Sequence, residues 1–170
     1  MKSKGNIVFL GMMGSGKTSI GKLISRKLKL DFFDIDELIE KNLKMNISKI
    51  FYNKGEKFFR DYEKETTLEV LKKKDIIVSL GGGAFLNKEI RNEVLNNHTS
   101  IWLCWNYKTL IDRIINSSKR PIAFNSTKDE LEKLIKKRSN FYSKAMYKVV
   151  CDDLTKNEIL KIILKIYETN

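Results

Sequence analysis

Residues 11 to 18 read Gly-Met-Met-Gly-Ser-Gly-Lys-Thr, the G-x-x-x-x-G-K-[ST] pattern of a loop that binds nucleotide phosphates. An apolar run at 7–10 precedes the loop, and apolar residues at helical spacing follow it, as this loop requires. Its backbone N–H groups would bind phosphate oxygens, while the Lys side chain neutralises charge and the Thr hydroxyl is a ligand of Mg²⁺. We therefore expect a site for ATP or GTP, with these nucleotide-binding residues: Gly14, Ser15, Gly16, Lys17, Thr18 and Ser19.

Two aspartates follow the second apolar run, Phe32-Phe33-Asp34-Ile35-Asp36. If this segment is extended throughout, alternation places Asp34 and Asp36 on the same side of a strand. The carboxyl ends of parallel strands face the ligand crevice, so both acids should lie near the γ-phosphate. One acid is expected to help hold hydrated Mg²⁺, and the other to bind an acceptor hydroxyl and take its proton. The alternative is that one of them, Asp36 in part, caps a helix that begins at Glu37.

A third apolar run, residues 76–80, leads directly into Gly81-Gly82-Gly83. Three successive glycines let the backbone approach a ligand closely, and their N–H groups can donate to it. At the end of a strand beside the phosphate loop, this run is expected to contact a bound ligand.

Arginine is rare in this chain, with 6 Arg against 27 Lys. Arg138 lies on the apolar stripe of a predicted helix at 127–146, and no acid lies three or four residues from it. An inward guanidinium needs an anion, which must come from elsewhere in the fold or from a ligand. Arg60 has a possible partner in Glu63. Two arginines in one crevice would suit a carboxylate, which each can bind through two N–H groups.

Residues 114–126 are polar, contain the only proline of the chain and lie between predicted helices. We expect a lid that closes over the nucleotide, although an ordinary surface connection would have the same composition. Arg120 in this segment is expected to stabilise charge on the phosphates during transfer. Arg113, one helical turn before this segment, is expected to contact the nucleotide.

Short apolar runs alternate with helical patterns along the whole chain. This alternation predicts an α/β fold in which a parallel sheet is covered by helices on both faces. A length of 170 residues fits one domain, residues 1–170. Two helical segments between the second and third strands, broken at 53–55, predict a lobe laid over the edge of the sheet. The expected strands are 6–10, 31–35, 75–80, 100–105 and 148–151.

The net charge of +12 raises the question of nucleic-acid or membrane binding. The basic residues are scattered among acids, and the two tight basic runs, 72–74 and 136–138, have no interleaved aromatic residues, so neither partner is expected. No run reaches the length of a membrane helix. Cys104 and Cys151 lie in strand-like apolar runs without metal-site or disulfide spacing, and are expected to be buried small hydrophobes. We therefore expect a cytoplasmic protein.

Six ordered motifs together make the chain resemble the shikimate kinase family over nearly its whole length. They are the phosphate loop, the Asp34-x-Asp36 pair with its following acids, Gly55-Glu56-x-x-Phe59-Arg60-x-x-Glu63, Gly81-Gly82-Gly83, Arg120-Pro121 and Arg138-x-x-x-Tyr142. The chain departs from the family pattern after Tyr142, where an acidic pair is lacking, and near Cys151-Asp152-Asp153-Leu154, on the adenine side.

The resemblance implies a three-layer P-loop NTPase fold with a five-stranded parallel sheet, an inserted substrate-binding lobe at about 34–60 and a lid at about 114–126. It implies phosphorylation of the 3-hydroxyl of shikimate by ATP with Mg²⁺, in a monomer. By the same resemblance, Asp36, Arg60, Gly82 and Arg138 bind shikimate, with Gly81 and Gly83 beside them. Asp34 and Thr18 serve the metal, and the catalytic residues are Lys17, Asp36 and Arg120.

Two other functions remain open from the sequence. One is a related small-molecule kinase that acts on gluconate or a nucleoside monophosphate. The other is a non-catalytic regulatory protein that binds nucleotides through the same fold. The glycine run with Arg60 and Arg138 argues against the first, and retention of both acids and Lys17 argues against the second.

Overall fold

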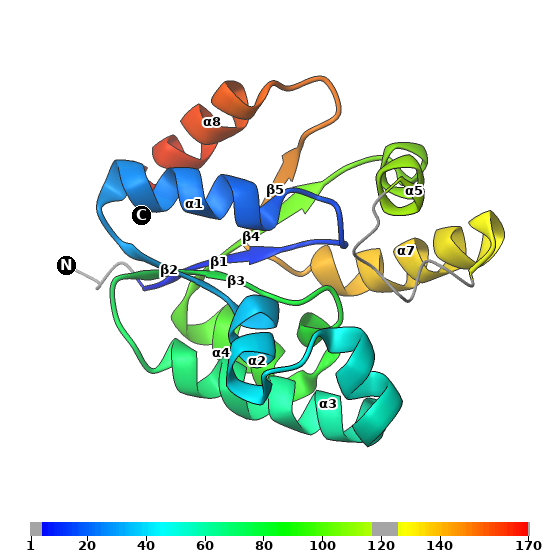
Figure 1. The fold of residues 1–170 in the computed structure, drawn as a ribbon. Helices are drawn as coiled ribbons and strands as arrows, with labels where there is room; N and C mark the ends of the chain where they lie inside the picture. Colours follow the sequence, from blue (N-terminus) through cyan, green and yellow to red (C-terminus); the bar gives the residue numbers. More distant parts are fainter. Residues whose placement is uncertain (1–4, 117–125, 170) are drawn as a thin grey trace.

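A single five-stranded sheet forms the centre of the protein, which the computed structural model describes at residues 5–116 and 126–169 (Figure 1). The strand order is β2-β3-β1-β4-β5, and all four neighbouring pairs are parallel. This confirms the predicted α/β fold, in which the carboxyl ends of all strands meet at one edge. The strands are β1 (Ile7–Leu10), β2 (Asp31–Asp34), β3 (Ile76–Ser79), β4 (Thr99–Cys104) and β5 (Tyr147–Val150).

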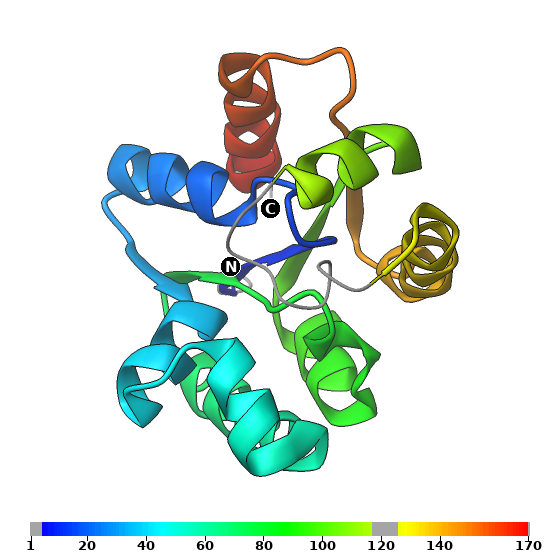
Figure 2. The same cartoon turned by 45° about the vertical axis from the view of Figure 1, so that its right-hand side comes forward.

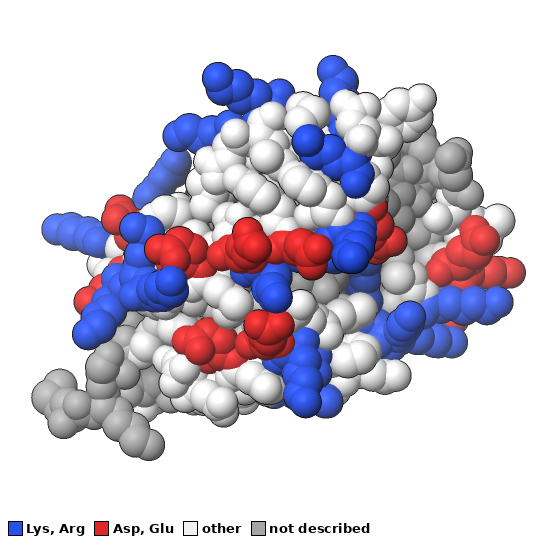
Figure 3. Space-filling view, turned by 90° about the horizontal axis from the view of Figure 1, so that it is seen from below, with Lys and Arg blue, Asp and Glu red and all other residues white. Residues whose placement is uncertain are grey.

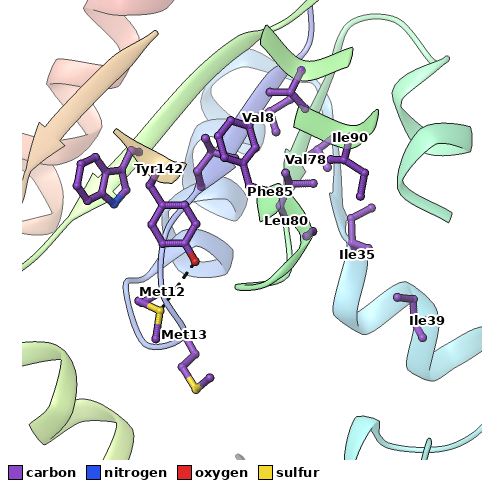
Figure 4. Close-up of a cluster of buried hydrophobic side chains, with 14 of the residues drawn as sticks. Val8, Met12, Met13, Ile35, Ile39, Val78, Leu80, Phe85, Ile90 and Tyr142 are labelled. Atoms are coloured by element: carbon purple, nitrogen blue, oxygen red, sulfur yellow. Dashed lines mark hydrogen bonds between the residues drawn. The ribbon is translucent and has the colours of Figure 1, made fainter. Parts of the chain in front are cut away.

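Helices cover both faces of this sheet, as Figures 1 and 2 show. One face is covered by α1 (Lys17–Leu28) and α8 (Lys156–Thr169), which pack on β1 and β4 through one apolar cluster. A second apolar cluster packs the remaining helices against the other face of the sheet. Its members include Met12 of the phosphate loop and Tyr142 (Figure 4). Those helices are α2 (Ile35–Leu43), α3 (Ile47–Leu71), α4 (Lys88–Asn97), α5 (Tyr107–Ile115) and α7 (Lys128–Tyr142), with a 3-10 turn η1 (Ala84–Leu86).

Helix starts follow the side chains that the sequence offers as caps. Thr127 and Glu130 form the predicted capping box at the start of α7. The side chain of Asn87 accepts from the backbone N–H groups of Glu89 and Ile90 at the start of α4, as predicted. These caps set where α4 and α7 begin, and α7 carries Arg138.

Three predicted element boundaries were wrong. The second strand ends at Asp34 rather than continuing through Asp36, because the Asp34 carboxylate caps α2 at once. The segment 37–60 breaks not only at Gly55 but also before α3, where Lys44 is left-handed with φ 52°. No glycine marks the end of α2, and the N-cap residue Asn46, whose side chain accepts from Lys49 N–H, was not singled out in the sequence. The predicted helix 127–146 ends at Tyr142, since Met146 N–H already bonds to Ser100 Oγ beside β5.

Both cysteines are free thiols. Cys151 is fully buried, as predicted, whereas Cys104 at the end of β4 is only partly buried. Their backbones are joined by the bond from Cys151 N–H to Cys104 C=O, at 2.9 Å.

Basic and acidic side chains are mixed on the surface rather than separated. Figure 3 shows Lys and Arg side by side with Asp and Glu on the face seen from below. Ion pairs of α3 follow this pattern, with Lys64 at 3.1 Å from Glu89 and Lys72 at 2.6 Å from Glu69. Much of the lysine excess is therefore solvated surface beside acids. In the described part of the chain, no helix has the length and apolarity to cross a membrane.

The one histidine of the chain makes stability dependent on pH. His98 follows α4, its side chain is 7% exposed, and burial lowers its pKa despite the nearby Glu93 carboxylate. A histidine with a lowered folded-state pKa stabilises the protein above about pH 6.5, and this contribution is lost as pH falls through the folded-state value. We expect the urea midpoint to fall between pH 7 and pH 5. The same titration of His98→Gln should be flatter, and equal slopes for both proteins would contradict this assignment.

Candidate active site

A cavity of about 470 Å³ opens at the carboxyl edge of the sheet, between the phosphate loop, the start of α2, α3, the glycine run and α7. It brings together residues that are far apart in the sequence but were predicted to act together. The cavity is lined by Met13, Thr18, Asp34, Asp36, Glu37, Glu40, Ile47, Ser48, Phe51, Phe59, Arg60, Glu63, Gly82, Gly83 and Arg138.

The phosphate loop runs from β1 into α1, with Gly16 left-handed at the helix start, φ 91°. Lys17 is buried, and its Nζ donates to the carbonyls of Gly11 at 2.8 Å and Met12 at 3.0 Å. The ammonium group thus lies inside the loop, where it can neutralise phosphate oxygens. Gly14 and Ser15 belong to the same loop, whereas Ser19 is exposed in the first turn of α1 and does not line the cavity.

Trp105, directly after the end of β4, supports this loop. Its indole Nε1 donates to the carbonyl of Ser15 at 2.9 Å. The guanidinium of Arg113 lies over the same indole ring, 3.7 Å from its centroid, and donates to Gly14 C=O at 3.3 Å. Arg113 therefore lies beside the phosphate loop, on the side away from the cavity residues of α2 and α3. Trp105 was not predicted as a site residue, because it lies outside the phosphate-loop pattern.

Asp34 joins the phosphate loop to α2. One carboxylate oxygen accepts from the Thr18 hydroxyl at 2.5 Å, and the other accepts from the N–H groups of Asp36 and Glu37. Asp34, and not Asp36 as the sequence suggested, is therefore the cap of the helix. Mg²⁺ prefers oxygen ligands and retains several waters, so a hydroxyl and a carboxylate oxygen side by side fit this ion.

Asp36 lies in the first turn of α2 rather than on a strand, yet it still lines the cavity. A Cβ at Gly81 would lie 2.6 Å from Asp36 Oδ1 and 2.6 Å from Glu63 Oε1. A Cβ at this position would force these two carboxylates to move, since real Cβ atoms do not approach oxygen so closely. Gly81 is itself buried behind the cavity, while Gly82 and Gly83 line it.

Arg60 points into the cavity from α3 and is held by an acid one turn away. Its Nη1 lies 2.7 Å from Glu63 Oε2, and Nε lies 3.4 Å from the more exposed Glu56. The pairing with Glu63 that the spacing suggested is confirmed. Glu63 is 2% exposed, and burial raises the pKa of its carboxyl while the Arg60 guanidinium opposes the shift. Part of the Arg60 guanidinium still faces the cavity.

Arg138 also faces inward, as the apolar stripe predicted, and is 6% exposed. Among the described residues its Nε has no hydrogen-bond partner, and its Nη1 lies 3.8 Å from the Met12 sulfur. Burial lowers the pKa of the guanidinium. No carboxylate within ion-pair distance compensates this buried charge in the described structure. The arrangement therefore suits an anionic ligand.

Some cavity residues have no counterpart in the predicted site. Phe51 and Phe59 are 4.6 Å apart, and the Arg60 guanidinium lies 5.1 Å from the Phe59 ring centroid. They give the cavity an apolar wall that lies against the Arg60 guanidinium. In the sequence, Phe59 was named only as part of a family motif, and Phe51 was not singled out. Arg120 and most of the predicted lid at 114–126 lie outside the described residues.

Comparisons with known proteins by family model, sequence and structure point to one family. The family model described as shikimate kinase matches residues 13–168. A shikimate kinase of Bacillus subtilis is 45% identical over 164 residues, which cover 94% of this chain and 87% of that protein. Among solved structures, a shikimate kinase from Acinetobacter baumannii in complex with shikimate has a TM-score of 0.92 at 26% identity, covering 99% of this chain and 96% of that one. The shikimate kinase of Aquifex aeolicus has a TM-score of 0.86 at 33% identity, covering 97% of each chain.

Proposed function

The chain belongs to the shikimate kinase family and phosphorylates shikimate with ATP, and we propose that the cavity beside the phosphate loop performs this transfer on the 3-hydroxyl. One observation carries the assignment of the cavity. Carboxylates, the partly exposed guanidinium of Arg60 and the buried guanidinium of Arg138 line one cavity beside the phosphate loop. Shikimate combines a carboxylate with neighbouring hydroxyl groups, so its two ends match these two kinds of group.

Binding begins with the carboxylate in this proposal. Arg60 and Arg138 each offer several N–H donors, and an Arg–carboxylate pair commonly forms two parallel hydrogen bonds. The backbones of Gly82 and Gly83 lie beside the guanidinium groups of Arg138 and Arg60, respectively. Because glycine has no Cβ, the ligand can approach these backbone atoms closely. Glu63 holds Arg60 in place, which reduces the entropy lost on binding. The ring hydroxyls then face Asp36.

Transfer requires the 3-hydroxyl oxygen to attack the γ-phosphorus in line with the bond to the β,γ-bridging oxygen. The new P–O bond forms as the bridging bond breaks, ADP leaves, and the hydroxyl proton passes to an Asp36 carboxylate oxygen. Lys17 neutralises charge on the phosphates. Arg120 is proposed to do so from the lid, on the strength of the sequence alone.

Thr18 and Asp34 are proposed to hold the Mg²⁺ that accompanies ATP. Support comes from the 2.5 Å contact between the Thr18 hydroxyl and the Asp34 carboxylate beside the phosphate loop. The ion would neutralise phosphate charge and orient the γ-phosphoryl group. The remaining nucleotide contacts are assigned to Gly14, Ser15, Gly16 and Ser19, with Arg113 at the nucleotide edge.

We further propose that residues 1–170 act as one kinase domain and as a monomer in the cytoplasm. The substrate-binding lobe comprises residues from about 34 to 60, and the lid comprises residues from about 114 to 126. The proposal of a monomer is supported by the cavity itself, to which one chain supplies Thr18, Asp34, Asp36, Arg60 and Arg138. Light scattering at assay concentration would test the oligomeric state.

A single alanine should separate acceptor binding from nucleotide binding. In Gly83→Ala the new Cβ would lie 2.5 Å from Arg60 Nη1 and 2.8 Å from Cζ. The guanidinium is the end of a flexible side chain, so it can move and the protein should fold. We expect KM for shikimate to rise about tenfold, the effect of weakening hydrogen bonds to a charged group, with KM for ATP within about twofold. An unchanged KM for shikimate would remove Arg60 from the proposed binding site.

The position of the transferred group can be read from the product. Phosphorus–proton correlation in the NMR spectrum should connect the new phosphate to the proton on carbon 3. Correlation to another ring proton would reject the proposed orientation of shikimate while leaving the family assignment intact.

A further inference from the structure

Tyr142 is the last residue of α7 and one of the most deeply buried side chains of the protein, at 1% exposure. It lies four residues after Arg138, so both side chains lie on the same face of the helix. Its ring packs beside Trp102, with ring centroids 6.0 Å apart. Figure 4 shows the ring in the apolar cluster with its hydroxyl directed toward the phosphate-loop residue Met12. This buried polar atom needs a partner.

The hydroxyl donates to the carbonyl of Gly82, with the sulfur of Met12 3.9 Å away. Arg138 Nη1 approaches the same sulfur at 3.8 Å. Burial raises the pKa of the phenol, which therefore remains protonated and able to donate. Three parts of the site thus meet at the end of this side chain: the phosphate loop, the glycine run and α7.

This bond fixes a peptide group that lines the cavity. A peptide is planar, so holding the Gly82 carbonyl also sets the direction of the Gly83 N–H on the opposite side. The backbone of Gly82 lies close to both neighbours, because a Cβ there would lie 3.1 Å from Arg138 Nη1 and 3.5 Å from Met13 N. A rotation of this peptide would displace the guanidinium or the phosphate loop.

We propose that Tyr142 is a positioning residue for the acceptor, whose hydroxyl holds the Gly82–Gly83 peptide in register with Arg138 and with the phosphate loop. This role rests on the proposed function of Gly82 and Arg138 in binding shikimate. Tyr142 itself is enclosed behind the cavity wall and is absent from the cavity lining. Its effect on the reaction is therefore indirect, through the position of other groups.

Tyr142→Phe removes the hydroxyl and keeps the ring. We expect kcat/KM for shikimate to fall about tenfold, mostly through KM, because a buried carbonyl loses its donor and the peptide can rotate. KM for ATP should stay within about twofold. Steady-state kinetics of the full-length protein, well below its melting temperature, would measure both constants.

Trp102→Phe is the matched control, because it disturbs the packing of the Tyr142 ring and leaves the hydroxyl in place. It should lower the melting temperature while leaving both KM values unchanged. If Tyr142→Phe behaves like this control, losing stability alone, Tyr142 is a core residue and the inference is wrong. Absence of shikimate turnover in the unmodified protein would instead overturn the proposed function on which the inference rests.

Discussion

Asp36→Asn is expected to lower kcat at least about a hundredfold, with KM for both substrates within about threefold. Asparagine keeps the shape of the side chain and the helical turn but cannot accept the hydroxyl proton. Asp36 lines the cavity from the first turn of α2, beside Asp34 and across Gly81 from Glu63. Asp36 lines the same cavity as the phosphate loop and the two arginines. The attacking hydroxyl group of shikimate must lie in this cavity for transfer.

The size of the loss separates two roles of this carboxylate. In a loose phosphoryl-transfer transition state, orientation of the hydroxyl supplies much of the acceleration, and an amide oxygen can still accept a hydrogen bond. A loss below about threefold would therefore remove Asp36 from proton transfer. Asp31→Asn is the matched control, because Asp31 is exposed at the opposite end of β2, away from the cavity. It should retain full activity.

Arg138→Lys is expected to lower kcat/KM for shikimate about a hundredfold, while KM for ATP changes by less than about threefold. Lysine keeps the charge but offers a single ammonium in place of a planar group that can make two parallel bonds. The large effect follows from burial, because Arg138 is 6% exposed and its Nε has no partner in the described structure. A substrate carboxylate bound beside Arg138 would neutralise the charge of its guanidinium and accept hydrogen bonds from its N–H groups.

Ligand-dependent melting gives the same test without catalysis. A ligand that binds only the folded state raises the melting temperature of the protein, and at a given concentration a tighter ligand raises it more. Shikimate should therefore stabilise the unmodified protein clearly more than Arg138→Lys. Arg26→Lys, the same change on an exposed residue at the end of α1, should respond like the unmodified protein. Equal loss of affinity for shikimate and ATP would make Arg138 a structural arginine.

The sequence predicted much of this site because its signals are local. The phosphate loop lies between a strand and a helix, which its sequence pattern requires. The helical spacing of Leu131, Ile135 and Tyr142 predicted that Arg138 faces the protein interior. The parallel sheet was predicted from the alternation of apolar runs and helical patterns, whereas the strand order became known only from the structure.

The other features of the site could not be predicted, because they depend on competing local structures or on contacts between residues far apart in the sequence. Asp34 and Asp36 are both acids near a strand end, and the sequence did not decide which one caps α2. The bond from Tyr142 to Gly82 joins residues 60 positions apart, so no local pattern reveals it. Glu63 was expected only as a partner of Arg60, and its position across Gly81 from Asp36 became visible in three dimensions.

The most direct test of the function is ADP release with different acceptors. The purified protein with Mg²⁺ and ATP would be given shikimate, gluconate, a nucleoside monophosphate or water alone, and ADP would be followed by a coupled assay. Shikimate should give turnover far above every other acceptor. Turnover with shikimate no greater than with water, while gluconate or the nucleotide is phosphorylated, would contradict the account.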